Sequence, residues 1–169
     1  GIFGSDTSSF SMMIKTAKHF FSYMSNLQKE NRQMHIGHNP AGAISVFVII
    51  TVLFVQASSG LFSQDDSFFP TEGPLSHFIS VDNSIAITNF HKLWWEYIVI
   101  LIIGIHIIAS MFYLIIKKQN LILPLFSGKK KLPKAANYKT LKFGSTKLAF
   151  TLLIITFSII VMIINLKNI

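Results

Sequence analysis

The chain has 169 residues, of which 51% are hydrophobic and 13% charged, and its formal net charge is +8. Soluble domains usually carry about 25% charged residues, so this composition is typical of a membrane protein. The absence of cysteine excludes disulfides, thiolate metal sites, iron–sulfur ligation and CxxCH haem attachment within the chain. Any metal that the chain holds must therefore use His, carboxylate or Met ligands.

The first segment with a pattern is Phe10–Met34, which mixes Met, Ile, Phe, Tyr and Leu with lysines and serines. This mixture predicts an amphipathic helix that lies on the membrane surface. A helix packed on cytoplasmic loops is an equally good interpretation.

Three apolar runs then follow, at about residues 41–61, 92–116 and 147–166. Each is long enough to cross a bilayer once, and in lipid the backbone must satisfy its own hydrogen bonds, so we expect three membrane helices. Asn39 suits the N-cap of the first helix and Pro40 its first helical position. The predicted fold is an all-α membrane protein, a partial transmembrane haem-binding helix bundle with an N-terminal amphipathic helix.

The loops between these spans differ in charge. The 62–90 loop contains four acidic residues and no Lys or Arg, whereas nine lysines lie in the 117–147 segment. The positive-inside rule therefore places the 62–90 loop outside and the 117–147 loop and the N-terminal segment in the cytoplasm of a bacterial inner (cell) membrane. The positive charge is interpreted first as a signal of membrane topology and as a means of contact with anionic lipid. No nucleic-acid partner is therefore expected.

Small and polar residues recur along the first span at steps of three, four or seven: Ala41, Ser45, Val52, Gln56 and Ser59. One interpretation is close packing of helices through small residues. The other is room for a flat cofactor, to which Gln56 would offer a hydrogen bond. The pattern leaves both open.

Two histidines, His91 and His106, lie on the second span. For a regular α-helix their separation is about 22 Å, with an angular offset of about 60°. One would lie near each leaflet, His91 outside and His106 inside, and Gly104 would leave space for a ring beside His106. A histidine in hydrocarbon is costly unless it is paired, hydrated or metal-bound. The pair suggests two metal centres. For His106 two alternatives remain: a proton relay, or a core histidine whose hydrogen bonds are satisfied within the protein.

Other polar and aromatic residues lie near the ends of the spans. His38, with His35, could line a haem edge, bind a propionate or simply be interfacial. Trp94 and Trp95 fit an aromatic belt. Glu96 lies four residues after Lys92, so an ordinary helical ion pair is expected.

Several short motifs, in the right order and spacing, resemble the bacterial cytochrome b561 and nickel–iron hydrogenase b-type cytochrome subunits. They are Gly1–Ser5 (GIFGS), Gly37–Gly42 (GHNPAG), Gln56–Phe62 (QASSGLF), Gly73–Leu75 (GPL), Lys118–Ile122 (KQNLI) and Ser127–Lys129 (SGK). The resemblance covers about residues 1–130, interpreted as a cytochrome b-like membrane domain. Residues 131–169 form a basic loop and an extra C-terminal membrane helix beyond it.

The resemblance implies a four-helix haem bundle that passes electrons between a partner dehydrogenase or hydrogenase and membrane quinone. It also implies that His91 and His106 are axial ligands of haem iron, one for each of two haems b. Gln56 and Ser45 would line the haem-facing side of the first span. The family's first two membrane helices, which carry the opposing ligands, are not matched here, and Thr7–Ser9 replaces the usual Arg. We therefore expect the opposing ligands to come from other helices or a second chain.

The sequence thus predicts a b-type cytochrome subunit, an electron carrier within an oxidoreductase complex rather than a catalyst on its own. The alternatives are a non-redox membrane scaffold, a fragment of a proton-relay transporter that uses His106, and a membrane oxidase or reductase that acts directly on a small molecule.

Overall fold

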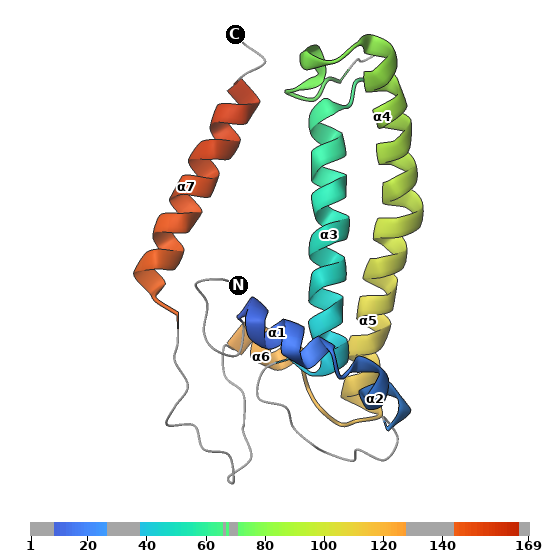
Figure 1. Cartoon of the computed structure of the whole chain (residues 1–169), viewed down its shortest axis with the longest axis vertical. Coiled ribbons are helices and arrows are strands. Elements are labelled where there is room, and N and C mark those ends of the chain that lie inside the picture. Colours follow the sequence, from blue (N-terminus) through green and yellow to red (C-terminus); the bar gives the residue numbers. More distant parts are fainter. Residues whose placement is uncertain (1–8, 27–37, 66, 68–70, 128–143, 166–169) are drawn as a thin grey trace. The chain divides into compact units, whose positions relative to one another are not determined.

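The computed structural model describes residues 9–26, 38–65, 67, 71–127 and 144–165, and these residues are all-α (Figure 1). The elements in chain order are α1 (Phe10–Ala17), α2 (Phe20–Ser25), α3 (Pro40–Phe62), the 3-10 helix η2 (Ser76–Phe78), α4 (Val81–Leu93), the π-helix η3 (Trp94–Val99), α5 (Ile100–Ile115), α6 (Ile122–Ser127) and α7 (Thr146–Asn165). Three helical stretches are long and apolar enough to cross a membrane: Pro40–Phe62, Val81–Ile115 and Thr146–Asn165. The predicted spans are confirmed at this level, and the chain has the character of a multi-pass membrane protein.

The start of α3 follows the sequence prediction. The Asn39 side-chain oxygen accepts a hydrogen bond from the Gly42 backbone N–H at 2.7 Å, and the Asn39 carbonyl accepts one from the Ala43 N–H at 2.8 Å. Pro40 occupies the first helical position, where its missing N–H costs no hydrogen bond. These contacts fix where the first span begins.

The second span is longer than the sequence suggests. Its helix begins at Val81 rather than near Lys92, after an N-cap at Ser80 whose hydroxyl accepts from the Asn83 N–H. The added turns, which precede Lys92, are rich in polar residues, so they do not belong to the apolar run of the sequence. Ser84 and Thr88 are buried, and their hydroxyls donate to the carbonyls of Phe62 and Gln64.

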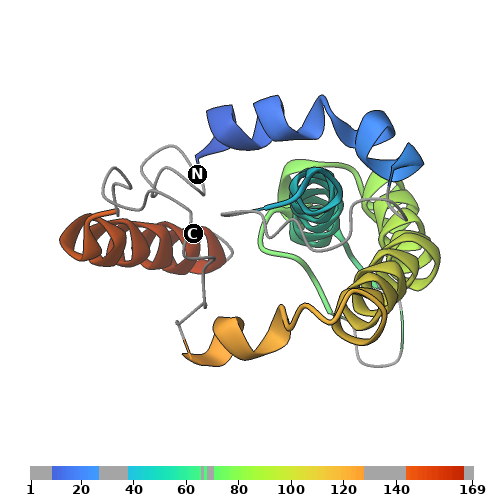
Figure 2. The same cartoon turned by 90° about the horizontal axis from the view of Figure 1, so that it is seen from below.

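The chain forms two compact units, the first made of residues 1–48 and 104–145. In this unit the Phe10 and Phe47 rings lie 5.9 Å apart between centroids, and the hydroxyls of Tyr23 and Tyr113 are 2.6 Å apart. Figure 2 looks along α3 and shows α1 and α2 lying across its direction. These contacts attach the N-terminal helices to the first turns of α3 and to α5.

The N-terminal amphipathic segment is two short helices rather than one. Thr16 donates its hydroxyl to the Met12 carbonyl at 2.9 Å, a local bond that competes with helix continuation. The chain then turns through Lys18 and His19 before α2 begins. Met13 is 3% exposed, so the segment packs against the protein on one side. The part of the prediction beyond Asn26 lies outside the described residues.

The second unit comprises residues 49–103 and 146–169. Within it, residues 49–62 of α3 run beside α4 in the opposite direction (Figure 1). The loop between them folds back over the end of α3, since the Leu75 N–H donates to the Leu61 carbonyl at 2.9 Å and the Gly73 N–H donates to the Ser63 carbonyl at 2.7 Å. These bonds satisfy carbonyls that a helix C-terminus leaves without intrahelical partners.

Helix α7 is described by itself. None of its described residues is buried, and most of its side chains are apolar, so it is long and apolar enough to cross a membrane. Several sequence features lie outside the described residues: the Gly1–Ser5 motif, His35 and most of the lysine-rich loop.

Candidate functional site

His91 lies in α4 and faces α3, where both of its ring nitrogens have partners. Its Nε2 is 2.9 Å from Nε2 of Gln56, and its Nδ1 is 2.9 Å from the Ser59 hydroxyl oxygen. Gln56 and Ser59 are three residues apart and therefore neighbours on one face of the helix. The structure thus brings together His91 and Gln56, two of the residues singled out in the sequence.

The Ser59 hydroxyl has one proton and two possible acceptors, the Gln56 backbone carbonyl at 3.0 Å and Nδ1 of His91 at 2.9 Å. With that proton on the Gln56 carbonyl, Nδ1 of His91 carries the ring proton and Nε2 accepts from the Gln56 amide. With that proton on Nδ1, the tautomer and the direction of the Gln56 contact are reversed.

The Gln56 side chain is left half satisfied by this arrangement. Its Oε1 is buried, and within the described part of the chain it has no hydrogen-bond partner. Exchanging the amide oxygen and nitrogen pairs Oε1 with a proton on Nε2 of His91, and Ser59 then donates to Nδ1 instead of to the Gln56 carbonyl. A buried carbonyl oxygen without a partner marks a place where a further polar group could bind.

Small residues make room for the His91 ring. A Cβ added at Gly60 would lie 3.1 Å from Cε1 of His91, so only glycine allows this approach without a shift of the ring. Gly104, the glycine predicted to leave space beside His106, behaves differently: among the described residues no heavy atom lies within 4 Å of the corresponding Cβ position. The close glycine belongs to α3 and not to the helix that carries the histidines.

A cavity of about 310 Å³ opens beside His91 at the end of α3. His91 and Gly60 line it together with polar residues of the 63–73 loop and of α4, among them Asp65 and Lys92. The Lys92 amine forms an ion pair with the Asp65 carboxylate at 3.3 Å. The expected pairing of Lys92 with Glu96 is therefore replaced by a contact with the loop.

His106 belongs to the other unit, in α5. Its Nδ1 is 3.2 Å from the hydroxyl oxygen of Ser45 in α3, while its own carbonyl accepts from the Ser110 hydroxyl at 2.9 Å. The ring is exposed. Each histidine thus directs Nδ1 to a serine of α3, Ser59 for His91 and Ser45 for His106.

His38 and Trp94 complete the set of residues noted in the sequence. His38 is exposed just before α3, and its Cδ2 would lie 3.7 Å from a Cβ at Gly42. Trp94 does more than a belt residue, since its indole N–H donates to the Val52 carbonyl of α3 at 3.2 Å. Trp95, by contrast, is 50% exposed, as a belt residue would be.

Two parts of the site were missed in the sequence. Ser59 appeared there only as a member of the small and polar stripe, although its position three residues after Gln56 was a usable signal. The π-helix Trp94–Val99 gave no signal, because a π turn has no distinct composition. Such turns are frequent at functional sites. The angular offset of about 60° expected for the two histidines assumed α-helical geometry throughout, and the π-helix contradicts that assumption.

The described residues offer single imidazoles rather than a cluster of metal ligands. Among the described residues no group of three or more His, Asp or Glu is placed to hold a metal ion. Haem iron needs only one imidazole from each side, and a ligating histidine usually donates its other N–H to an oxygen. Ser59 provides that oxygen for His91.

Comparison of the chain with protein-family models, curated proteins and solved structures finds no match.

Proposed function

We propose that the chain is a membrane subunit of a b-type cytochrome, in which His91 and His106 each supply one axial ligand to a haem. The observation that carries the proposal is the contact of each Nδ1 with a serine hydroxyl of α3, at 2.9 Å for Ser59 and 3.2 Å for Ser45. A nitrogen held in this way leaves Nε2 as the coordinating atom and makes the imidazole a better ligand.

The residues of α3 have separate tasks in this proposal. Ser59 would accept from Nδ1 of His91 and fix the orientation of the ring. Gln56 occupies Nε2 in the described structure, so its amide must turn away before that nitrogen can coordinate iron. Gly60 keeps the space against the ring open. When bound, haem supplies a one-electron redox change at its iron.

The proposed placement of the two haems across the membrane follows from the charge pattern. With the lysine-rich 117–147 segment in the cytoplasm, His91 belongs to the outer haem and His106 to the inner one. Electrons would pass between a dehydrogenase or hydrogenase partner and quinone, and a partner helix or second chain would provide the opposing ligand of each haem. His38, Gln56 and Ser45 would line the haem edges.

Haem content tests this proposal. The chain is expressed in its native membrane, purified with its partners, and assayed for haem b by the pyridine haemochrome method. His91→Ala and His106→Ala should each remove about half of the haem, and His77→Ala, a change of an exposed histidine in the 62–90 loop, should remove none. Full haem content in both axial variants would refute the proposal.

A proton relay is the second candidate, favoured by the exposure of His106 beside a serine hydroxyl. Reconstituted vesicles separate the two functions. A relay predicts proton flux that is lost in His106→Ala but retained in His91→Ala, without any haem absorbance.

A further inference from the structure

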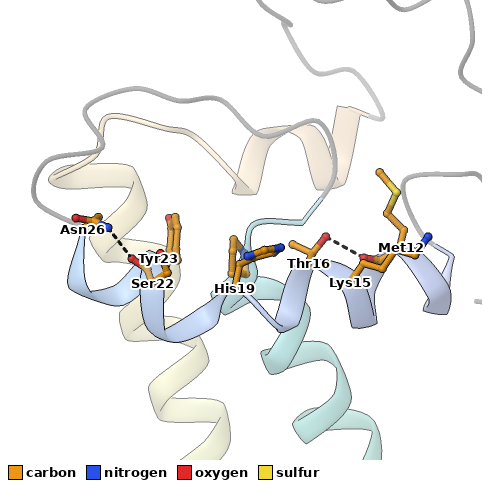
Figure 3. A pocket seen from close by; sticks show the side chains of 8 residues that line it. Met12, Lys15, Thr16, His19, Ser22, Tyr23 and Asn26 are labelled. Carbon is orange, nitrogen blue, oxygen red and sulfur yellow. Dashed lines mark hydrogen bonds between the residues drawn. The ribbon is translucent and has the colours of Figure 1, made fainter.

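A second cavity, of about 530 Å³, lies in the unit that contains the N-terminal helices (Figure 3). Lys15, Thr16, His19 and Tyr23 are among the residues that line it, and all four belong to the α1–α2 segment or to the turn within it. The proposed cytochrome function uses none of them. The cavity is therefore a candidate for a separate binding role.

The cavity is an open groove, since five of the residues that line it are exposed. The turn at Lys18 and His19 separates α1 from α2, and the Tyr23 hydroxyl anchors α2 to Tyr113 of α5 at 2.6 Å. Pro40, the first residue of α3, also lines the cavity. The N-terminal end of a 23-residue helix, which carries partial positive charge, thus adjoins a space that already contains an amine and an imidazole.

Among the described residues of this unit, every Asp, Glu, Lys or Arg side chain is a lysine. Residues 9–26, 38–48, 104–127 and 144–145, the described part of this unit, contain no Asp or Glu but include Lys15, Lys18, Lys117 and Lys118. All carboxylates that the structure describes belong to residues 49–103. Lys15 and His19 therefore favour an anion as the ligand of this cavity.

Large apolar side chains are exposed on the same two helices. The exposed fractions are 84% for Phe21, 50% for Ile14, 46% for Met12 and 45% for Met24. A short helical segment with exposed apolar residues and lysines is typical of an element that lies in the membrane interface. The cavity is then at the depth of the lipid headgroups.

We propose that the Lys15–His19 cavity binds the phosphate of an anionic phospholipid headgroup, with Phe21 and its apolar neighbours among the acyl chains. Basic pockets on membrane proteins recognise anionic headgroups in this way. Free orthophosphate shares the phosphate chemistry, but it has no acyl chains to occupy the apolar surface beside the cavity.

The full chain in detergent, titrated with phosphatidylglycerol and observed by native mass spectrometry, tests the proposal. The double variant Lys15→Ala/His19→Gln should bind the lipid at least about fivefold more weakly, the effect of one cation near an anionic headgroup. Lys18→Ala removes the same charge from the same segment, yet Lys18 does not line the cavity, so this control should stay within about twofold of the wild type. Lys15→Arg should retain binding, and circular dichroism should show unchanged helix content in all variants.

Three results would overturn the proposal. One is unchanged lipid binding in the double variant, and another is an equal loss in Lys18→Ala, which would indicate only a general effect of charge. The third is displacement of phosphatidylglycerol by millimolar orthophosphate with no preference for the lipid, which would identify a free-phosphate site. None of these results depends on haem content, so this proposal and the cytochrome proposal can fail independently.

Discussion

The Ser59 hydroxyl joins the His91 ring to the backbone of α3. Its oxygen lies 2.9 Å from Nδ1 of His91 and 3.0 Å from the Gln56 carbonyl oxygen. Ser59 is 9% exposed, so the bond is shielded from solvent. One buried hydroxyl thus holds the orientation of the histidine ring and the direction in which its other nitrogen points.

Ser59→Ala should lower the free energy of unfolding by about 1–3 kcal/mol, because it leaves Nδ1 of the half-buried His91 without its hydrogen-bond partner. Thermal unfolding in detergent, followed by circular dichroism, measures the effect. Ser58→Ala makes the same chemical change one residue away and should shift stability by less than about 0.5 kcal/mol. Equal effects for the two variants would show that the Ser59–His91 bond contributes nothing.

Gln56→Leu should change stability much less, by about 1 kcal/mol at most. It removes the hydrogen bond to Nε2 of His91, but it also removes the buried Oε1 that has no partner in the described structure. The same unfolding experiment tests this expectation. A loss as large as that of Ser59→Ala would indicate that Oε1 does have a partner, such as bound water.

Gly73→Ala should destabilise the loop over α3 by about 1–3 kcal/mol, the usual range for overpacking. A Cβ at this position would clash with the backbone carbonyl oxygens of Gly60 and Leu61, which cannot move as a flexible side chain can. Gly104→Ala is the matched control. Its Cβ meets open space, so the higher helix propensity of alanine should leave stability unchanged or raise it by up to about 1 kcal/mol.

The two tryptophans should report different surroundings. In Trp95→Phe the remaining Trp94 is half-buried and bonded to the Val52 carbonyl, whereas in Trp94→Phe the remaining Trp95 is 50% exposed. Brominated lipids should therefore quench fluorescence more strongly in Trp94→Phe than in Trp95→Phe. Equal quenching would contradict the placement of Trp94 against α3.

The three spans could be predicted from the sequence because a long apolar run with few charges rarely folds as anything but a membrane helix. The start of α3 at Asn39 and Pro40 could also be predicted from the sequence, since both residues act locally. The start of α4 at Val81 could not be predicted, because its first turns are polar and become buried only through contacts with the folded loop. Tertiary contacts of this kind leave no periodic signal.

The candidate site, like the fold, could be predicted from the sequence only in part. His91 and Gln56 could be selected as unusual polar residues in apolar helices, but their hydrogen bond depends on how α3 lies against α4. Glu96 illustrates the opposite error: the four-residue spacing suggested an ion pair with Lys92, and the loop residue Asp65 takes that role. Sequence spacing cannot weigh a local partner against one that folding brings from 27 positions away.

Axial coordination is tested most directly by chemical rescue of the ligand. His91→Gly creates space for free imidazole, so about half of the low-spin haem signal in electron paramagnetic resonance, the part from the outer haem, should be lost in that variant and restored when imidazole is added. Wild-type protein and His77→Gly should keep the signal without imidazole. A low-spin signal in His91→Gly that equals the wild type without imidazole would contradict the assignment of His91 as a haem ligand.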